Sequence, residues 1–345
     1  MRFEGLLASW DGEHAVIRHD ADSGAWLFVC VHSTVLGPAG GGTRMRVYAT
    51  PADGLADAMG LSRAMTRKMA AAGIPRGGGK AVLAVPALPS GEARRRLLLR
   101  YGELVSSLGG SYRTAGDMNV SPADLDVVAE RCPWVYGTSG RGGDSGVGTA
   151  RGVLHGIRAA LEHVFGSPEL AGRSVVVQGC GAVGAELARG LAAAGADVRV
   201  SDVDPERVRA TGLPALPPEE AVTAACDVYA PCAVGGTLDA ASIPHLGCRI
   251  VAGSANNQLT EPADAERLHE RGILYAPDYV INAGGVVQLV GLEDEGWDEE
   301  QLEQGLARIG DALRELFREA AEAGIDPAAA ADRLVDRRLA AARRA

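Results

Sequence analysis

Lysine is almost absent from this chain of 345 residues. Of the 34 side chains that are lysine or arginine, two are lysine, Lys68 and Lys80, and the remaining 34 − 2 = 32 are arginine. A buried ammonium group can lose its proton, whereas a guanidinium group stays charged. A chain that keeps two lysines only 80 − 68 = 12 positions apart therefore indicates that an amine is needed there. Codon bias without a function is the alternative.

Other shortages exclude whole classes of protein. The formal net charge of −10 at pH 7 argues against a nucleic-acid-binding protein, which would carry a basic face. No apolar run approaches the roughly 20 residues that span a bilayer. The N-terminal segment MRFEGLLASWDGEHAV is too short and too acidic for a secretory signal. We therefore expect no nucleic-acid partner, no membrane association and a cytoplasmic location.

Cysteine is scarce too, and its spacing has no metal or disulfide signature. No two of the six cysteines form a CxxC pair, and none pairs with a histidine at a metal-ligand spacing. The six are Cys30, Cys132, Cys180, Cys226, Cys232 and Cys248. We interpret them as small buried residues in a reducing compartment, and we predict no metal site.

Length and pattern predict an α/β protein of two domains. The first 138 residues alternate strand-like and helix-like segments, which implies a parallel or mixed sheet. The expected strands are 14–18, 26–32, one opened by Lys80, and 112–115, and the expected helices are 51–73, 94–108 and 122–131. A Gly- and Ser-rich stretch, YGTSGRGGDSG, indicates a hinge and a domain boundary. A second strand–helix domain is expected at 139–325 and a C-terminal helix at 326–345.

The segment Gly179–Gly184, GCGAVG, matches a dinucleotide-binding turn because it follows the apolar strand Val175–Val177 and opens a helix. Its three glycines would permit a tight turn, the approach of a pyrophosphate and close helix–strand packing. The residues assigned to the cofactor here are Gly179, Gly181, Ala182, Val183 and Gly184. Asp202 follows 202 − 179 = 23 residues later, where a carboxylate binds the adenosine ribose and repels a 2′-phosphate. NAD is therefore expected rather than NADP; a structural turn without a nucleotide is the alternative.

The lysines invite a different interpretation. A GGGK run ends at Lys80, but it is not a P-loop, because Ile74 replaces its first glycine and Ala81 its Ser/Thr. We expect Lys68 and Lys80 to face one cleft, where burial and neighbouring charge let one amine titrate near neutrality as a general base. The other would pair with a substrate carboxylate. Asp117, just past a strand, is the candidate partner acid or base; a helix-dipole role for Lys68 and a loop role for Asp117 are the alternatives.

Nine colinear segments resemble the glutamate/leucine/phenylalanine/valine dehydrogenase family, in its branch acting on apolar amino acids. They are LGPAGGGTRMR (36–46), MTRKMAAAGIPRGGGKAV (65–82), TAGDMN (114–119), GVGTARGV (146–153), GCGAVG (179–184), SDVD (201–204), YAPCAVGG (229–236), AGSANNQL (252–259) and YAPDYVINAGGV (275–286). The resemblance implies NAD-linked, reversible oxidative deamination of an apolar L-amino acid, aromatic or branched-chain, to the 2-oxo acid and ammonia.

The resemblance also implies an architecture. Residues 1–138 would form a substrate-binding and oligomerisation domain with a mixed sheet, and residues 139–325 a Rossmann NAD-binding domain. The helix at 326–345 would pack back on the first domain. Members of the family are oligomers, so we expect a homo-oligomer.

Individual residues gain roles from the same resemblance. Lys68 would bind the substrate α-carboxylate, Lys80 would activate water for attack on the imine carbon, and Asp117 would exchange protons with the amino group. The other substrate-binding positions are Gly40, Gly41, Gly42, Ala115, Asn257, Asn282, Val286 and Leu289. The other cofactor-binding positions are Thr149, Ala233 and Asn257.

Three positions depart from the family pattern. Asn119 and Val120 stand where Gly-Thr is usual, which leaves rate and substrate range open and makes a non-catalytic NAD-binding sensor the alternative. Gly40 replaces a bulky apolar residue of leucine-type members, which would leave space for a larger substrate group. No charged residue stands on the expected pocket wall, so glutamate is not expected as substrate. A 2-hydroxy-acid dehydrogenase is not expected either, because four histidines outside the strands lack a local carboxylate partner; these are His155, His163, His245 and His269.

Overall fold

The computed structural model describes residues 3–344, which separate into two compact units. The first unit holds the residues up to Gly143 together with those from Arg338 onward, and the second holds Asp144–Arg337. The helix α1 (Phe3–Ser9) opens the described chain. None of the helices within residues 3–344 is long and apolar enough to cross a membrane.

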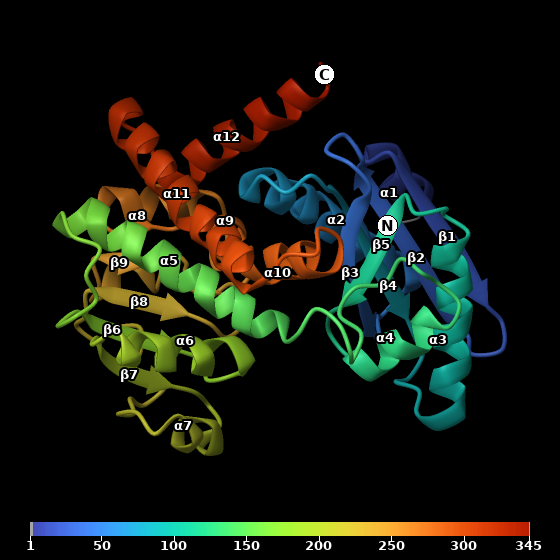
Figure 1. Ribbon diagram of the computed structural model, residues 1–345, viewed down its shortest axis with the longest axis horizontal. Helices are drawn as coiled ribbons and strands as arrows, with labels where there is room; N and C mark the ends of the chain where they lie inside the picture. The colour runs from blue at the N-terminus through green and yellow to red at the C-terminus, as the bar shows by residue number, and fades with distance from the viewer. Residues whose placement is uncertain (1–2, 345) are drawn as a thin grey trace. The chain divides into compact units, whose positions relative to one another are not determined.

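A five-stranded mixed sheet lies in the middle of the first unit (Figure 1). Its strands are β1 (His14–Asp20), β2 (Ala25–Ser33), β3 (Ala39–Arg46), β4 (Gly77–Ala84) and β5 (Tyr112–Gly116), in the spatial order β1-β2-β4-β3-β5. β2 pairs antiparallel with β1 and with β4, whereas β3 pairs parallel with β4 and with β5. The predicted mixed sheet is confirmed.

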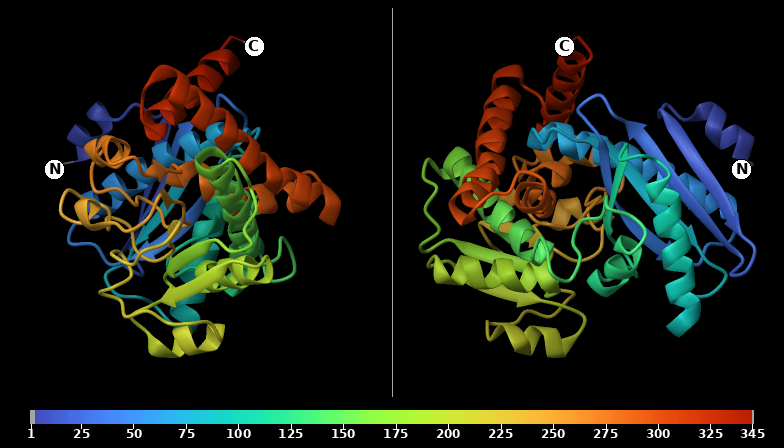
Figure 2. Two further views of the ribbon diagram at one scale, coloured as in Figure 1. Left: turned by 90° about the vertical axis from the view of Figure 1, so that its left-hand side faces the viewer. Right: turned by 45° about the vertical axis from the view of Figure 1, so that its right-hand side comes forward.

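Helices cover both faces of this sheet, which Figure 2 shows from two further sides. They are α2 (Pro51–Ala72), α3 (Gly91–Ser106) and α4 (Pro122–Ala129). Successive strand residues point to opposite faces. Val82 of β4 therefore packs in one cluster with Leu55 of α2, while the next residue, Leu83, packs in another with Leu97 of α3.

The glycine-rich segment around Gly41 forms strand β3, which the sequence patterns did not predict. A Cβ on Gly41 would lie 1.8 Å from the carbonyl oxygen of Gly79 on β4, so the two backbones meet without side chains. Because glycines interrupt the alternation of apolar and polar residues, the usual strand signal is missing. The prediction that Lys80 opens the next strand is wrong. β4 begins at Gly77, which places Lys80 inside the sheet with 7% of its surface exposed.

The second unit contains a five-stranded sheet that is entirely parallel (Figure 1). Its strands are β6 (Ser174–Gln178), β7 (Asp197–Ser201), β8 (Val228–Pro231), β9 (Ile250–Val251) and β10 (Leu274–Tyr275), in the order β10-β9-β8-β6-β7. The chain passes from β6 to β7 on one side and then to β8 on the other side of β6. This reversal is the switch point at which doubly wound sheets bind ligands, beyond the carboxyl ends of their strands.

Helices of several lengths accompany this second sheet. They are α5 (Ser145–Phe165), α6 (Ala182–Ala193), α7 (Pro205–Thr211), the short 3-10 helix η1 (Ile243–His245), α8 (Ala263–Glu270), α9 (Asp278–Ile281), α10 (Gly284–Glu293), α11 (Glu299–Ala323) and α12 (Pro327–Ala342). An apolar stripe lies along α11, and all five of its members are buried: Leu302, Leu306, Ile309, Leu313 and Phe317. The predicted α/β class is confirmed for both units.

The end of α12 belongs to the first unit. Arg338 donates hydrogen bonds of 2.7 Å from Nη1 to the carbonyl oxygens of Ala70 and Ala71, near the C-terminus of α2. These carbonyls lie in the last turn of α2, and the C-terminal end of a helix attracts a cation. The domain boundaries near residues 138 and 325 remain a proposal.

The close approach of α2 to β4 gives a test of the fold. A Cβ on Gly78 would lie 2.1 Å from the backbone nitrogen of Thr66, so Gly78→Ala should lower the free energy of unfolding by about 2–3 kcal/mol. Gly60 is the matched control, because it is exposed on the same helix with nothing within 4 Å of its Cβ position. Gly60→Ala should raise the free energy of unfolding by about 0.5–1 kcal/mol. Urea unfolding measures both, and equal effects would contradict the packing described.

Candidate active site

Lys80 and Asp117 form an ion pair in the first unit. Lys80 Nζ lies 2.7 Å from Asp117 Oδ2. Lys80 comes from the middle of β4, and Asp117 directly follows β5. β3 lies between these strands, and a Cβ on its Gly42 would sit 3.0 Å from the Cβ of Asp117 and 2.6 Å from the carbonyl oxygen of Gly116. Because Gly42 has no side chain, the lysine and the aspartate meet across the strand that separates them.

Burial has opposite effects on the two members of the pair. It lowers the pKa of Lys80 below its usual value, and the negative charge of Asp117 offsets this only in part. Burial alone would raise the pKa of Asp117, but the positive charges of Lys80 and Arg44 outweigh it, so that this pKa lies below its usual value. A lysine with a lowered pKa beside an ionised carboxylate is suited to general base catalysis.

A network that the sequence did not reveal extends from this pair. Arg44 Nε donates to Asp117 Oδ2 at 3.1 Å, and Arg44 Nη1 donates to Asp57 Oδ2 at 3.0 Å. Tyr48 donates its hydroxyl hydrogen to the same Asp57 oxygen at 2.6 Å. Arg44 stands two residues after Gly42, so strand alternation places both on one face. That spacing was the available signal, and it needed β3 to be recognised as a strand.

The loop after Asp117 is held in place by the residues that depart from the family pattern. Asn119 adopts a left-handed backbone conformation with φ 59°, which asparagine tolerates better than most residues other than glycine. Its Nδ2 donates to the carbonyl oxygen of Met45 at 3.0 Å, and its own carbonyl accepts from Arg94 Nη2 at 2.7 Å. Val120 is buried in the core beside α3 and α4. Asn119 and Val120 therefore stabilise the conformation of this loop.

The other substrate-binding candidates of the first unit lie on β3, β5 and α2. Gly40 and Ala115 share the sheet face of Lys80, because cross-strand partners point the same way. Lys68 is half-buried on α2, four residues before its last residue. A Cβ on Gly40 would have a single close neighbour within 4 Å, the Cε methyl of Met69 at 3.2 Å. Met69 is 2% exposed, so the space opened at Gly40 is bounded by a flexible thioether that the sequence interpretation missed.

The nucleotide turn has the geometry that its three glycines require. Gly179 has φ 98°, and its amide donates to the carbonyl oxygen of Ser201 at 2.7 Å. A Cβ on Gly184 would lie 1.9 Å from the carbonyl oxygen of Gly179, so α6 packs directly on the end of β6. Gly181 has nothing within 4 Å of its Cβ position, which leaves the backbone open to a ligand at the N-terminus of α6.

Asp202, at the end of β7, is fixed by two backbone amides. Its Oδ2 accepts from the amide of Cys180 at 2.7 Å, and its Oδ1 accepts from the amide of Asp204 at 2.8 Å. Burial would raise the pKa of Asp202, but the hydrogen bonds from these amides outweigh it, so that this pKa lies below its usual value. An open glycine backbone and a fixed carboxylate 21 positions apart fit the pyrophosphate and ribose of a dinucleotide such as NAD (202 − 181 = 21).

Asn282 carries a buried polar atom that has no partner among the described residues. The side chain is 5% exposed, and its Nδ2 donates to the carbonyl oxygen of Ser254 at 3.1 Å and to Asn256 Oδ1 at 2.9 Å. Its Oδ1 is buried and accepts no hydrogen bond within residues 3–344. An unsatisfied acceptor of this kind calls for an explanation, and a donor on a ligand provides one.

The remaining candidates lie in the second unit with different exposure. Thr149 donates its hydroxyl hydrogen to the carbonyl oxygen of Ser145 at 2.8 Å. Asn257 is exposed with φ 51°. Half-buried or exposed positions are Ala182, Val183, Ala233, Val286 and Leu289.

The predicted residues divide between the two units. The first unit holds Gly40, Gly41, Gly42, Lys68, Lys80, Ala115 and Asp117, and the second holds the rest. Val286 and Leu289 belong to the second unit, so a pocket that they share with Gly40 and Ala115 remains a prediction.

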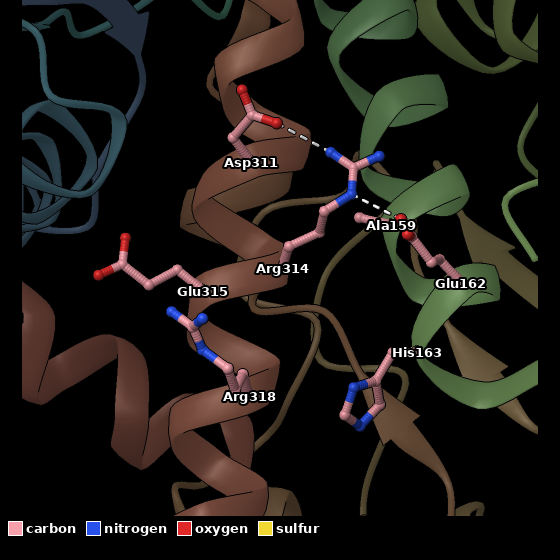
Figure 3. Close-up of a pocket in the computed structure, with 7 residues that line it drawn as sticks. All are labelled: Ala159, Glu162, His163, Asp311, Arg314, Glu315 and Arg318. Carbon is pink, nitrogen blue, oxygen red and sulfur yellow. Dashed lines mark hydrogen bonds and ion pairs between the residues drawn. The ribbon is translucent and has the colours of Figure 1, made fainter. Parts of the chain in front are cut away.

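One surface pocket of about 400 Å³ lies elsewhere in the second unit, between α5 and α11 (Figure 3). Arg314 crosses it, with Nε 2.7 Å from Glu162 Oε2 and Nη1 2.9 Å from Asp311 Oδ1. The pocket contains none of the predicted site residues. His155, on the same helix pair, lies 2.8 Å from Glu303 Oε1, a carboxylate partner 148 residues away that local sequence inspection could not find.

Comparison with known proteins identifies the family. The family model of the Glu/Leu/Phe/Val dehydrogenase dimerisation domain matches residues 17–134. The family model Glutamate/Leucine/Phenylalanine/Valine dehydrogenase matches residues 206–345. The chain is 46% identical to valine dehydrogenase of Streptomyces virginiae over 341 residues, which cover 96% of this chain and 94% of the relative. It is 38% identical to leucine dehydrogenase of Geobacillus stearothermophilus over 346 residues, which cover 98% and 94%.

A solved structure agrees over the whole length. L-tryptophan dehydrogenase from Nostoc punctiforme matches with a TM-score of 0.86 and 37% identity, covering 100% of both chains. The fold and these relatives define an amino acid dehydrogenase, an oxidoreductase that acts on CH–NH2 groups with NAD(P). The chain belongs to the glutamate/leucine/phenylalanine/valine dehydrogenase family, as the sequence resemblance predicted.

Asp124 anchors the loop that carries Asp117, and its ionisation makes this anchor sensitive to pH. It accepts from Arg94 Nε at 2.6 Å and Nη2 at 2.8 Å, and it closes the capping box of α4 with Ser121. Burial opposes ionisation, but these hydrogen bonds outweigh it and lower the pKa of Asp124 to about 2. Because the pKa is lower in the folded state, this stabilisation is present above the unfolded pKa of about 4 and disappears as pH falls toward 2.

Asp124→Asn should therefore lower the free energy of unfolding at pH 7 by about 1–3 kcal/mol. The difference between wild type and variant should shrink steadily between pH 4 and pH 3, because the wild type begins to lose the same charge. Asp336→Asn, at an exposed position on α12, is the control and should change the free energy by less than about 0.5 kcal/mol. Urea unfolding across this pH range measures both. A cost at position 124 that does not change with pH would contradict the assignment.

Proposed function

We propose that the protein catalyses NAD-dependent, reversible oxidative deamination of an apolar L-amino acid to its 2-oxo acid and ammonia. The substrate is aromatic, such as phenylalanine, or branched-chain, such as leucine or valine. The ion pair of buried Lys80 and half-buried Asp117 carries the proposal, because it supplies a base and an ionised carboxylate in a family of amino acid dehydrogenases. The relatives are named for valine, leucine and tryptophan, which all have apolar side chains.

The proton transfers are assigned to this pair. Lys80 takes a proton from the water that attacks the imine carbon, a step for which its lowered pKa suits it. Asp117 exchanges a proton with the amino group as ammonia leaves. Lys68 pairs with the substrate carboxylate, assisted by the backbone of Gly41 and Gly42. These glycines are buried, so the carboxylate would be held against backbone rather than against side chains.

The second unit supplies the cofactor site. When bound, NAD accepts the hydride that leaves the α-carbon of the substrate. The open backbone at Gly181 and the first turn of α6 would hold the pyrophosphate, and Asp202 would hold the adenosine ribose. A fixed carboxylate there repels a 2′-phosphate, which favours NAD over NADP. Thr149 and Asn257 would contact the nicotinamide, and Asn282 Oδ1 would accept a hydrogen bond from the cofactor or the substrate.

We further propose a cytoplasmic homo-oligomer. The match of residues 17–134 to a dimerisation domain supports self-association. The six cysteines are free thiols in the structure, as a reducing compartment would maintain them.

The non-catalytic sensor is not favoured by any feature of the site. This alternative was considered because Asn119 and Val120 are unusual at these positions. Asn119, however, adopts a left-handed backbone conformation of the kind that glycine usually takes, and Val120 is buried.

An activity assay with a panel of L-amino acids tests the proposal. NADH should form from phenylalanine, leucine or valine at alkaline pH, and NADPH should form at least about tenfold more slowly at equal cofactor concentration. Lys80→Ala should lower kcat by about 10²–10⁴-fold, the usual contribution of a general base. NADH binding followed by fluorescence is the control, since the nucleotide residues lie in the other unit and should be unaffected. Full turnover by Lys80→Ala would overturn the assigned mechanism.

Substrate size should respond to position 40. Gly40→Leu fills the space next to the Cε of Met69, so kcat/KM for phenylalanine relative to valine should fall by about tenfold or more. The double variant Gly40→Leu/Met69→Ala removes the methyl that the new side chain meets and should recover part of the activity toward phenylalanine. An unchanged substrate ratio in Gly40→Leu would show that Gly40 does not line the pocket.

A further inference from the structure

One guanidinium group links the catalytic carboxylate to a second carboxylate on α2. Arg44 Nε lies 3.1 Å from Asp117 Oδ2, the same oxygen that lies 2.7 Å from Lys80 Nζ. Arg44 Nη1 lies 3.0 Å from Asp57 Oδ2, and Tyr48 holds that oxygen at 2.6 Å. The side chains of Arg44 and Asp57 are 18% and 25% exposed, so solvent screens their charges only in part.

We propose that Arg44 is a positioning residue of the active site: anchored by Asp57 and Tyr48, it orients Asp117 toward Lys80 and sets the pH at which Lys80 becomes a base. The proposal rests on the proposed function, which assigns proton transfer to Lys80 and Asp117. A planar guanidinium is suited to this task, because it donates in two fixed directions and remains charged at every working pH.

The geometry makes Arg44 a competitor of Lys80 for one oxygen atom. Both cations meet Asp117 Oδ2, so the carboxylate divides its attraction between them. If Arg44 lost its charge, Asp117 would attract the Lys80 ammonium more strongly, and the pKa of Lys80 would rise. If Asp57 lost its charge, Arg44 would interact more strongly with Asp117. Asp117 would then stabilise the Lys80 ammonium less, and the pKa of Lys80 would fall. The two substitutions should therefore act on Lys80 in opposite directions.

Charged groups around Lys80 agree with these signs. Burial lowers the pKa of Lys80 most, Asp117 and Asp57 raise it, and Arg44 lowers it. Cys30, its neighbour on β2, stays neutral because burial raises the pKa of the thiol to about 12. The other cations of the adjoining α2 and β5 are unchanged in the variants at Arg44 and Asp57; they include Arg63, Arg67, Lys68 and Arg113.

The pH dependence of kcat/KM distinguishes this role from a purely structural one. Because Lys80 must be neutral to act, activity rises as pH increases through its pKa. Arg44→Gln should shift this acidic limb upward by about one pH unit, and Asp57→Asn should shift it downward. Arg63→Gln removes an equal charge from α2, but Arg63 pairs with Asp11 instead, so the limb should not move.

Arg44→Lys separates charge from geometry. It keeps the positive charge but cannot reach both carboxylates with a rigid fork, so its acidic limb should stay near that of the wild type while kcat falls. Shifts of the same sign in Arg44→Gln and Asp57→Asn, or no shift in either, would overturn the proposal. If Arg44→Gln does not fold, Asp57→Asn and Arg44→Lys still decide it.

A measurement without turnover keeps this test independent of the proposed reaction. The chain has only two lysines, so labelling with lysine enriched in 13C at Cε gives two side-chain signals, and Lys68→Arg assigns them. The chemical shift of Lys80 followed against pH should yield a higher pKa in Arg44→Gln and a lower one in Asp57→Asn. Those shifts in an enzyme that oxidises no amino acid would refute the proposed function and support the role of Arg44. If the enzyme is active but the pKa of Lys80 is the same in both variants as in the wild type, the proposed function is supported and the role of Arg44 is refuted.

Discussion

The candidate active site depends on a lysine that is buried within a β-sheet and still meets its carboxylate partner. Burial disfavours the ammonium form of Lys80, whereas the charge of Asp117, 2.7 Å away, stabilises that form. The pKa of Lys80 is therefore lowered, but Asp117 limits the decrease. This balance is possible only because Gly42, on the strand between them, has no side chain. Close backbone contacts, buried charge and base strength are therefore consequences of one local arrangement.

The two units present their candidate functional groups in different ways. The first unit positions charged side chains on a sheet face, and the second leaves the backbone at Gly181, after the end of β6, without close neighbours. Asp202 acts in the second unit as Asp117 does in the first, as a carboxylate held by neighbouring groups at the end of a strand. The chemistry proposed here assigns proton transfer to one unit and the cofactor to the other.

Local signals made the glycine turn after β6 predictable, whereas the network around Arg44 could not be predicted. Strand, glycines, helix and Asp202 lie within one strand–helix–strand unit, so their order alone defines the turn. The contact of Arg44 with Asp57 and Asp117 joins three separate elements and exists only once β3 is in place. Glycine hid that strand, since it supplies neither alternation nor β-branched side chains. Met69 escaped notice for the same reason, because it meets Gly40 only through the packing of α2 on this sheet.

The rarity of lysine also makes the first unit report on its own stability. A protease that cleaves after lysine has only two sites in the entire chain, one in α2 and one in β4. Lys80 lies within a strand whose residues are all buried, so its peptide bond becomes accessible only when the centre of this sheet opens. The rate of cleavage there would measure the free energy of that opening under native conditions, provided that reclosing is faster than cleavage. Of the two lysines, Lys80 is therefore the one whose cleavage reports how firmly the centre of this sheet is closed.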